Sequence, residues 1–308
     1  MFGPASLSNL GPGYDTLGLC IKGMGDVVTA TLCDESGVRV LCIGDARLPT
    51  DPVRNTAAKA ANAVLELAGS SLGLALTIRK GIPVGSGIGG SAASATAGAW
   101  AANVLLGTPF TREDLVEAVL EGEAVASGGC RHGDNVLPSL FGGLVLTSSV
   151  NPADYRCIAL RKSVSIAVVL PQLEIMTADA RRLLPSNVPL RSAVENASDL
   201  AFLIQAISAG DWSKAGRYMM RDRLVEPVRA EFVPCYRGVR KAALAAGAAG
   251  CALTGSGPAM FAIAKTPTIA NQALEAMRTA CLEAGIEADG MVTEADQGGV
   301  RTLTGSQQ

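Results

Sequence analysis

PVGSGIGGSAAS, residues 83–94, is the stretch that decides the fold. Its four glycines, at positions 85, 87, 89 and 90, separate a β-like run from an alanine-rich run with helical character. Glycine lets backbone N–H groups crowd around an anion where a Cβ would collide, and the start of a helix adds unpaired N–H groups and the positive end of its dipole. A strand, a glycine turn and a helix start in this order favour a phosphate-binding site, and with it phosphoryl transfer.

The composition is that of a globular protein with a sizeable core. The chain has 308 residues, of which 48% are hydrophobic and 18% charged, and its formal net charge is −2. There is no basic block, so we expect no nucleic-acid partner. No run approaches the roughly 18 apolar residues of a membrane span, and residues 1–13 contain neither a cationic start nor an apolar stretch, so we expect no membrane association and no signal peptide.

The eight cysteines indicate a reducing environment. They are scattered, form no C-x-x-C pair, and mostly stand inside apolar runs. That distribution is typical of buried free thiols and not of zinc ligands or a disulfide framework. We therefore expect a cytoplasmic protein.

Strand-like and helix-like patterns are mixed in both halves, which predicts an α+β or α/β protein in two parts. Strands are expected at 26–32, 38–42, 74–80, 142–148, 164–170, 250–254, 259–264 and 289–293. Helices are expected at 55–68, 91–106, 111–127, 177–184, 192–209, 211–223, 235–247 and 268–284. We expect an irregular stretch at 128–138, a hairpin turn at 255–258 and a frayed end after Gly305. The polar break at 148–154 predicts a boundary between domains at 1–150 and 151–308.

The glycine stretch leaves other interpretations open. Gly85, Gly87 and Gly90 also satisfy the G-x-G-x-x-G pattern of a Rossmann dinucleotide site, which would make the protein an NAD-dependent oxidoreductase. That loop normally belongs to the first βα unit and is followed about 20 residues later by a strand ending in Asp or Glu, and neither condition holds. The Walker pattern is absent, and a glycine turn that only packs a helix on a sheet is a further alternative.

Two more motifs combine glycines with polar residues. PASLSNLGPGYDTLG (4–18) holds Asn9 and Asp15 and, taken alone, predicts a polar loop with Asx turns. GCALTGSGPAMFAI (250–263) predicts strand, turn and strand, either as a lid over a phosphate or as a plain hairpin.

Together, in this order, the three motifs resemble those of the GHMP kinases, a superfamily of small-molecule kinases, and within it the homoserine kinase family. EGEAVASG (121–128), RHGDNVLPSLFGG (131–143), TADARRLLP (177–185) and MRDRLVEPVRAEFVP (220–234) extend the resemblance over nearly the whole chain. It implies an N-terminal α/β domain like one in a ribosomal small-subunit protein, a C-terminal ferredoxin-like domain, and ATP between them. It also implies a homodimer and phosphorylation of the L-homoserine side-chain hydroxyl, on the route to threonine.

Phosphoryl transfer requires charge neutralisation and positioning, so the implied site combines amide donors with a metal. The loop residues for ATP are Pro83, Val84, Gly85, Ser86, Gly87, Ile88, Gly89, Gly90, Ser91, Ala92 and Ala93, and the adenine would lie near Asn55 and Lys80. Ser91 and Glu123 match the family's Mg²⁺ ligands. Spacing alone does not separate Glu123 from Glu121, or either from an ordinary surface carboxylate.

Homoserine is a zwitterion with a hydroxyl group, and the resemblance supplies a partner for each part. Arg181 and Arg229 occupy the carboxylate-binding positions, where a planar guanidinium suits a carboxylate best. Arg182, next to Arg181, leaves the choice between the two open on the residues alone. We expect Asp15 to bind the ammonium group.

Asn9, His132 and Asn135 would line the pocket around the hydroxyl. His132, the single histidine, is expected as pocket wall. An amide cannot accept a proton, so Asn135 would orient the hydroxyl while the γ-phosphate or water takes its proton. Asp134 is an alternative base, and equally a structural residue.

The chain departs from the family pattern in two places. Position 90 is glycine where the family more often has serine. Only Met1–Gly3 precede the first motif, so we expect either a short first strand or a true start that lies upstream. The rival functions are another small-molecule kinase of the mevalonate or sugar type, the oxidoreductase, and a non-catalytic sensor that binds ATP.

Overall fold

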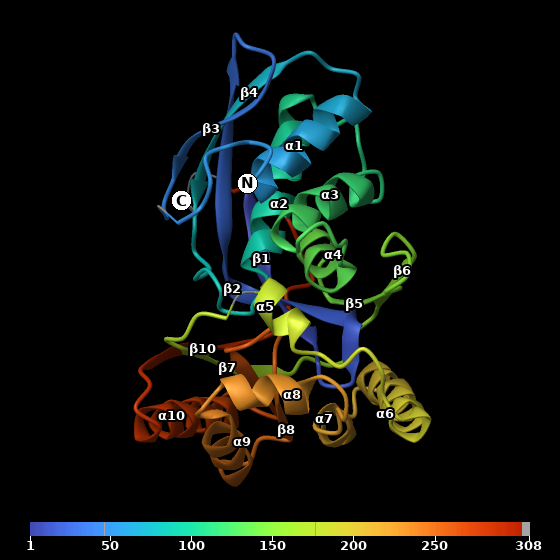
Figure 1. Cartoon of the computed structure of the whole chain (residues 1–308), viewed down its shortest axis with the longest axis vertical. Coiled ribbons are helices and arrows are strands. Elements are labelled where there is room, and N and C mark those ends of the chain that lie inside the picture. Colours follow the sequence, from blue (N-terminus) through green and yellow to red (C-terminus); the bar gives the residue numbers. More distant parts are fainter. Residues whose placement is uncertain (46, 176, 304–308) are drawn as a thin grey trace.

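Two β-sheets, each covered by helices, make up the molecule and lie one above the other in Figure 1. The computed structural model describes residues 1–45, 47–175 and 177–303. The first sheet, with α1 to α4, forms the upper body in Figure 1, and the second sheet, with α6 to α10, forms the lower body. The short helix α5 (Thr177–Arg182) lies between the two bodies. This arrangement is the α+β class with two parts that the sequence predicts.

The first sheet has six strands in the order β3-β4-β2-β5-β6, and β1 pairs with β2. Their bounds are β1 Phe2–Asn9, β2 Gly13–Cys33, β3 Gly37–Ile43, β4 Gly73–Arg79, β5 Leu144–Thr147 and β6 Tyr155–Ile158. Apart from the parallel pair β3 and β4, the neighbouring strands are antiparallel. The doubly wound parallel sheet of a Rossmann domain is therefore not the architecture of this body.

Helix α2 is the buried centre of the upper body. The four helices here are α1 Thr56–Leu67, α2 Gly90–Leu105, α3 Val116–Ala126 and α4 Gly133–Phe141. Helix α2 packs on β1 and β2, and α1 and α3 pack on α2. Small residues make this possible: a Cβ added at Gly98 would stand 2.3 Å from the carbonyl oxygen of Ala57. Most residues of α2 are buried, in agreement with its alanine-rich sequence.

The second sheet has the order β10-β7-β9-β8 and is antiparallel throughout. Its strands are β7 Ser165–Pro171, β8 Gly250–Leu253, β9 Met260–Ala264 and β10 Ala288–Thr293. Its helices are α6 Leu190–Ser208, α7 Trp212–Met219, α8 Glu226–Arg229, α9 Tyr236–Ala245 and α10 Pro267–Glu283, with a 3₁₀ turn η1 at Ala230–Phe232.

Alternate residues of β7 explain how the two bodies are joined. Ala167 and Val169 belong to a core formed with α9 and α10. Ile166 and Val168 face the other way, into a core that also contains Leu7 and Leu19 of the first sheet. Because side chains alternate along a strand, one short apolar segment serves two cores, and the second of them bridges the two sheets.

The chain also returns to the first sheet at its C-terminal side. Residues Ile21 and Phe2 form isolated bridges with Ala295 and Arg301. On the other side, β6 pairs with β5 just beyond residue 150. The boundary at 150/151 stays a prediction of the sequence. Within the part of the chain described here, no helix combines the length and apolar character needed to cross a bilayer.

Three local predictions are wrong. Residues 4–18 are not a loop but most of β1, a tight turn and the start of β2, because their apolar residues, such as Leu7 and Leu17, are buried. Residues 128–138 are not irregular throughout, since α4 begins at Gly133 and tolerates Pro138 inside it. The helix expected from Thr111 begins only at Val116.

The hydrogen bonds from Thr111 N–H and Oγ1 to Asp114 close a separate turn ahead of α3. The hairpin of β8 and β9 is confirmed. The turn between β8 and β9 also lines the cavity between the two bodies. Gly305 and the rest of the expected frayed end lie outside the described residues. Of the seven cysteines whose side chains are described, all are free and four are buried.

Candidate active site

A cavity of about 450 Å³ opens between the two bodies, and most of the predicted site residues line it. These are Asn9, Asp15, Asn55, Lys80, Pro83, Val84, Gly85, Ser86, Gly87, Gly89, Gly90, Ser91, Glu123, His132, Asn135, Arg181 and Arg229. The side chains of Ile88, Ala92 and Ala93 are instead fully buried in the cores, so these three residues offer only their backbone. Segments from nearly the whole length of the chain meet here.

The glycine loop has the backbone geometry of an anion cradle. Gly85, Gly87 and Gly89 have φ values of 71°, 82° and 72°, which is left-handed backbone that glycine adopts without strain. Gly89 is also the N-cap of α2, so the first N–H groups of this buried helix face the cavity without a side-chain cap. A Cβ at Gly89 would lie 2.3 Å from Ser6 Oγ, which shows how closely the loop packs on β1.

Position 90, where the resembled family more often has serine, is tight as well. A Cβ added at Gly90 would meet Ile82 Cγ2 at 3.1 Å and Lys80 Nζ at 3.5 Å. Glycine therefore gives Lys80 and Ile82 room behind the start of α2.

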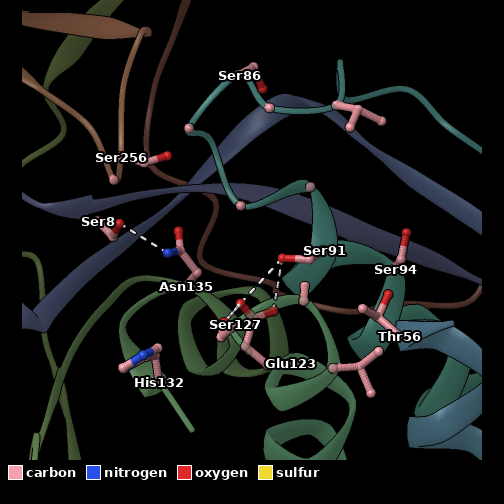
Figure 2. Close-up of a pocket in the computed structure, with 18 of the residues that line it drawn as sticks. Ser8, Thr56, Ser86, Ser91, Ser94, Glu123, Ser127, His132, Asn135 and Ser256 are labelled. Carbon is pink, nitrogen blue, oxygen red and sulfur yellow. Dashed lines mark hydrogen bonds between the residues drawn. The ribbon is translucent and has the colours of Figure 1, made fainter. Parts of the chain in front are cut away.

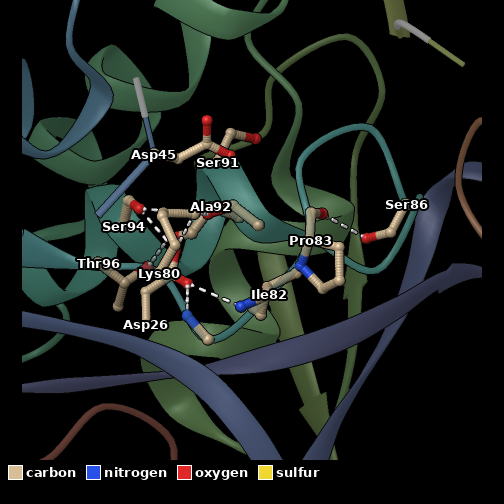
Figure 3. A network of polar contacts seen from close by, with 12 residues as sticks. Asp26, Asp45, Lys80, Ile82, Pro83, Ser86, Ser91, Ala92, Ser94 and Thr96 are labelled. Carbon is tan, nitrogen blue, oxygen red and sulfur yellow. Dashed lines mark hydrogen bonds and ion pairs between the residues drawn. The ribbon is translucent and has the colours of Figure 1, made fainter. Parts of the chain in front are cut away.

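A buried ion pair fixes both ends of this loop (Figure 3). Asp26 on β2 is fully buried and pairs with Lys80 at the end of β4. The same carboxylate accepts hydrogen bonds from the backbone N–H groups of Gly81 (3.0 Å) and Ile82 (3.2 Å), ahead of the loop, and from Ser94 Oγ (2.6 Å) on α2. Lys80 Nζ in turn donates to the carbonyl of Gly90 at 2.9 Å.

Lys80 was expected near an adenine ring. Its ammonium group is instead paired with Asp26 beneath the loop, and its side chain is only 10% exposed. Because Lys80 Nζ also donates to the carbonyl of Gly90, its positive charge lies next to the glycine loop. Asn55 is paired too. Its side chain caps α1 by accepting from Ala58 N–H at 3.1 Å and donates to the carbonyl of Pro49 at 3.0 Å. An adenine contact of either residue stays a prediction.

Ser91 and Glu123 come together as predicted, and Ser127 joins them (Figure 2). Ser91 Oγ donates to the Glu123 carboxylate at 3.0 Å and Ser127 Oγ donates to it at 3.1 Å. Burial raises the pKa of Glu123 to about 7, against the two hydroxyl groups and the more distant charge of Lys80, which lower it. Glu121 points elsewhere, toward Lys59 at 3.2 Å, so the structure separates the two carboxylates.

This cluster fits a small hard cation. It offers a buried carboxylate and hydroxyl oxygens at the end of the glycine loop, and oxygen ligands are what Mg²⁺ prefers. Among the residues described, there is no group of three or more His, Cys, Asp and Glu side chains that would hold a metal by itself. A metal here would thus take its remaining ligands from phosphate oxygens and water, as Mg²⁺ commonly does.

Asn135, in the first turn of α4, is held by two serines of β1. Its Oδ1 accepts from Ser6 Oγ and its Nδ2 donates to Ser8 Oγ, both at 3.0 Å. Figure 2 shows the latter bond, with His132 at the end of the preceding loop. Asn9 Nδ2 donates to the carbonyl of Gly255 at 3.1 Å, so the hairpin turn of the lower body takes part in the wall of the cavity.

The other end of the cavity is rich in opposite charges. Asp15 and Arg181 form a two-pronged ion pair, with N–H···O distances of 2.9 and 3.0 Å, and His132 Nδ1 lies 3.7 Å from Asp15. Arg229 donates to the carbonyl of Gly255 at 2.6 Å. Burial lowers the pKa of His132, so the ring is neutral near pH 7.

Two buried nitrogen atoms at this end have no hydrogen-bond partner among the described residues. They are His132 Nε2 and Arg229 Nε. Buried polar atoms are almost always paired, so an unpaired donor beside a cavity indicates a group that a ligand would satisfy.

Several functional candidates escaped the sequence analysis. The guanidinium groups of Arg181 and Arg229 both lie over the ring of Tyr14, at 5.3 and 5.1 Å from its centroid. Asp26 could have been noticed as the one charged residue of the stretch 26–32, which is otherwise apolar or threonine. Arg47 lines the cavity entrance and reaches Glu174 of the lower body at 3.2 Å, a contact with no local pattern in the sequence.

Asp134, left open as base or structural residue, lines the cavity although it is nearly buried. Burial, together with Asp15 and Glu123, raises the pKa of Asp134 to about 7.

Comparisons with known proteins agree with this geometry. Residues 55–143 match the family described as the GHMP kinases N terminal domain, and residues 203–283 match the GHMP kinases C terminal domain. The homoserine kinase of Pyrococcus furiosus is 38% identical over 97% of this chain and 98% of its own. The chain belongs to the homoserine kinase family of the GHMP kinases.

The solved structure of the homoserine kinase of Cytophaga hutchinsonii is similar to this chain over nearly its whole length. It has a TM-score of 0.94 at 37% identity and covers 98% of this chain and 96% of its own. The L. major mevalonate kinase, solved in complex with R-mevalonate, has a TM-score of 0.72 at 18% identity over 96% of this chain and 94% of its own. At that identity it shows the shared GHMP kinase fold alone.

Proposed function

We propose that this protein transfers the γ-phosphoryl group of ATP to the side-chain hydroxyl of L-homoserine, giving O-phospho-L-homoserine for threonine biosynthesis. We propose Mg²⁺ as the metal, the cytoplasm as the location and a homodimer as the assembly. The observation that carries the proposal is that one cavity has two chemically different ends. A loop of free amides with a buried carboxylate lies at one end, and an Asp15–Arg181 pair with Arg229 lies at the other.

At the first end, the main chain would hold the triphosphate. The N–H groups of the glycine loop and of the first turn of α2 offer several donors to phosphate oxygens. Lys80 adds a positive charge from below without leaving Asp26. Ser91 and Glu123 would hold Mg²⁺, which when bound neutralises charge on the β- and γ-phosphates.

At the second end, the charges suit a zwitterion. Homoserine carries a carboxylate and an ammonium group, so it can insert into the Asp15–Arg181 pair and exchange one ion pair for two. Its carboxylate would bind Arg181 and the unpaired Nε of Arg229, and its ammonium group would bind Asp15. Neither a sugar, which lacks both charges, nor mevalonate, which lacks the ammonium, would satisfy all three side chains.

Asn135 would orient the hydroxyl that attacks the γ-phosphate. Ser6 and Ser8 fix its amide from both sides, which would let it position the substrate hydroxyl. Because an amide is not a base, it cannot remove the proton of that hydroxyl. In this proposal the γ-phosphate or water accepts the proton, and Asp134 is the alternative acceptor. Asn135→Ala is expected to lower kcat, and full turnover by that variant would remove this role.

An ADP-release assay on a panel of acceptors tests the proposed function. We expect turnover with ATP and L-homoserine and at most trace turnover with mevalonate or galactose. A preference for mevalonate or galactose would overturn the substrate. Binding of ATP and homoserine without any turnover would indicate a sensor, and binding of NAD without binding of ATP would indicate an oxidoreductase.

A further inference from the structure

Glu226 is a buried carboxylate outside the cavity that the proposed reaction does not use. It is the first residue of α8, the four-residue helix that ends at Arg229. The residue is 6% exposed. Burial raises its pKa to about 7, with Tyr236 and Arg240 lowering it in part. A carboxyl group in such a place costs free energy unless its hydrogen bonds are worth more.

Glu226 faces the backbone of Leu253, the hydroxyl of Tyr236 and Arg240 Nη1, which lies 4.0 Å from its Oε1. Arg240 Nη1 donates to Tyr236 Oη at 2.7 Å, and because an arginine has no acceptor, the tyrosine hydroxyl must direct its own proton elsewhere. It donates to Glu226 Oε1 at 2.6 Å. Arg240 Nη2 also donates to the carbonyl of Met220 at 2.9 Å. Arg240, Tyr236 and Glu226 thus form one chain that links α9 to α8.

The backbone of α8 is held independently at its start. Asp222 accepts the N–H groups of Leu224 at 2.8 Å, Val225 at 3.2 Å and Glu226 at 2.7 Å. Three residues after Glu226, the guanidinium of Arg229 reaches the carbonyl of Gly255 at 2.6 Å. Asn9 of the first sheet binds the same carbonyl oxygen.

We propose that Glu226, through Tyr236 and Arg240, is a positioning residue that holds α8 so that Arg229 meets the carboxylate of the substrate. The proposal rests on the proposed function, because it assumes that Arg229 binds that carboxylate. A helix of one turn has little stability of its own, so tertiary contacts must fix its orientation. Arg229 is 4% exposed. Its planar guanidinium binds a carboxylate well only when its N–H groups point at the carboxylate oxygens.

The contribution is geometric. The carboxylate of Glu226 accepts from Tyr236 and lies outside the cavity that Arg229 lines, so it acts on Arg229 through the position of α8. What matters is then the hydrogen bond to Tyr236, and a neutral acceptor in place of the carboxylate would preserve it. This separates the proposal from an electrostatic role and gives a conservative variant that should restore function.

Steady-state kinetics on four variants test it. Glu226→Leu removes the acceptor, Tyr236→Phe removes the donor, and Glu226→Gln keeps an acceptor. Tyr218→Phe is the matched control, because Tyr218 is in the same body, stacks on Phe202 and lies outside the network. The readouts are KM for homoserine, KM for ATP, kcat and the thermal midpoint.

We expect Glu226→Leu and Tyr236→Phe to raise KM for homoserine about 10-fold, less than the roughly 100-fold that a 1 Å misplacement can cost. KM for ATP and kcat should stay within about 2-fold of the parent, as should every parameter of Glu226→Gln and Tyr218→Phe. If Glu226→Leu does not fold, Tyr236→Phe carries the test alone. Equal rises in both KM values, or a lower thermal midpoint with unchanged KM values, would overturn the positioning role.

Arg229→Ala separates this inference from the proposed function. If Arg229→Ala raises KM for homoserine and Tyr236→Phe does not, the positioning role fails and the proposed function stands. If Arg229→Ala leaves KM for homoserine unchanged, the proposed carboxylate site itself is wrong.

Discussion

The two ends of the cavity are built in different ways. The phosphate end is nearly continuous in sequence, since the strand end at Lys80, the glycine loop and the first turns of α2 all lie between residues 80 and 94. The amino-acid end is assembled from Asp15, His132, Arg181 and Arg229, which are far apart in the chain and come from both bodies. One end is therefore a local structure that needs anchoring, and the other exists only when the two bodies meet.

This difference has energetic consequences. At the phosphate end the donors are backbone groups, and the buried Asp26–Lys80 pair serves to hold the loop in place. At the amino-acid end the side chains themselves would bind, and in the structure they pair with one another. A substitution at the first end should lower stability, ATP binding or turnover. A substitution at the second end should weaken the binding of homoserine alone.

The largest effect is expected at Asp26. Asp26→Asn leaves Lys80 buried beside a neutral amide, and breaking a buried ion pair costs about 3–5 kcal/mol. Urea unfolding measures this loss. Glu294→Gln, in the exposed pair with Lys22, is the matched control and should change little, because both side chains are about half exposed. Equal stability of the two variants would show that the loop does not depend on Asp26.

Glu123→Gln should remove most of the catalytic activity while leaving binding of homoserine intact. It deletes the only charged ligand proposed for Mg²⁺, and we expect kcat to fall about 100- to 1,000-fold. Assays over a range of Mg²⁺ concentrations measure the effect, with Glu121→Gln as the control on the same helix. A kcat close to that of the parent would place the metal elsewhere.

The pH dependence of stability gives a second test of Glu123. Its pKa in the folded protein is about 7, above the ordinary value of 4.5, so the folded state binds the extra proton between these pH values. The free energy of unfolding should therefore fall as pH rises from about 4.5 to about 7 without Mg²⁺. Asp134 and Glu226 contribute in the same direction, so the difference between the parent and Glu123→Gln isolates Glu123.

Added Mg²⁺ should stabilise the parent more at pH 8 than at pH 6, because it binds the ionised carboxylate. Thermal midpoints with and without the metal measure this. An equal gain at both pH values, or the same gain in Glu123→Gln, would contradict the assignment.

Asp15→Asn should act on the amino-acid end alone. It removes the proposed partner of the ammonium group and leaves Arg181 without its carboxylate, so we expect KM for homoserine to rise about 30-fold or more. KM for ATP should not change. Isothermal titration with each ligand checks the split, and a parallel loss of ATP affinity would show that the two ends are not independent.

The smallest effect is expected at Tyr14. Its ring contacts two guanidinium groups, and a cation–π contact contributes about 0.5–2 kcal/mol. Tyr14→Leu should raise KM for homoserine about 5-fold, whereas Tyr14→Phe, which keeps the ring, should match the parent. If both variants behave alike, the ring does not organise the two arginines.

The same division decides how far sequence analysis reached. The strand, loop and helix around residues 74–106 were predicted within about two residues, because glycine and helix signals act locally. The glycines and polar residues of 4–18 favour a loop, although Ala5, Leu7, Leu17 and Leu19 alternate with other residues as in a strand. The strand forms because these four side chains are buried, and the sequence alone does not show that burial. Helix α4 was missed because Pro138 marks a break unless the surrounding core supports it.

By itself, the sequence determined the glycine loop, the alanine-rich helix behind it and the supply of charged residue types that the proposed zwitterion would need. These depend on backbone freedom, helical periodicity and side-chain charge, which are properties of neighbouring residues. Only the tertiary structure decided that Asp26 and Lys80 hold the loop, that Glu123 and not Glu121 faces Ser91, and that Tyr14 contacts both Arg181 and Arg229. Those relations join residues on separate elements, and they come into being when the shared core closes the two sheets over the cavity.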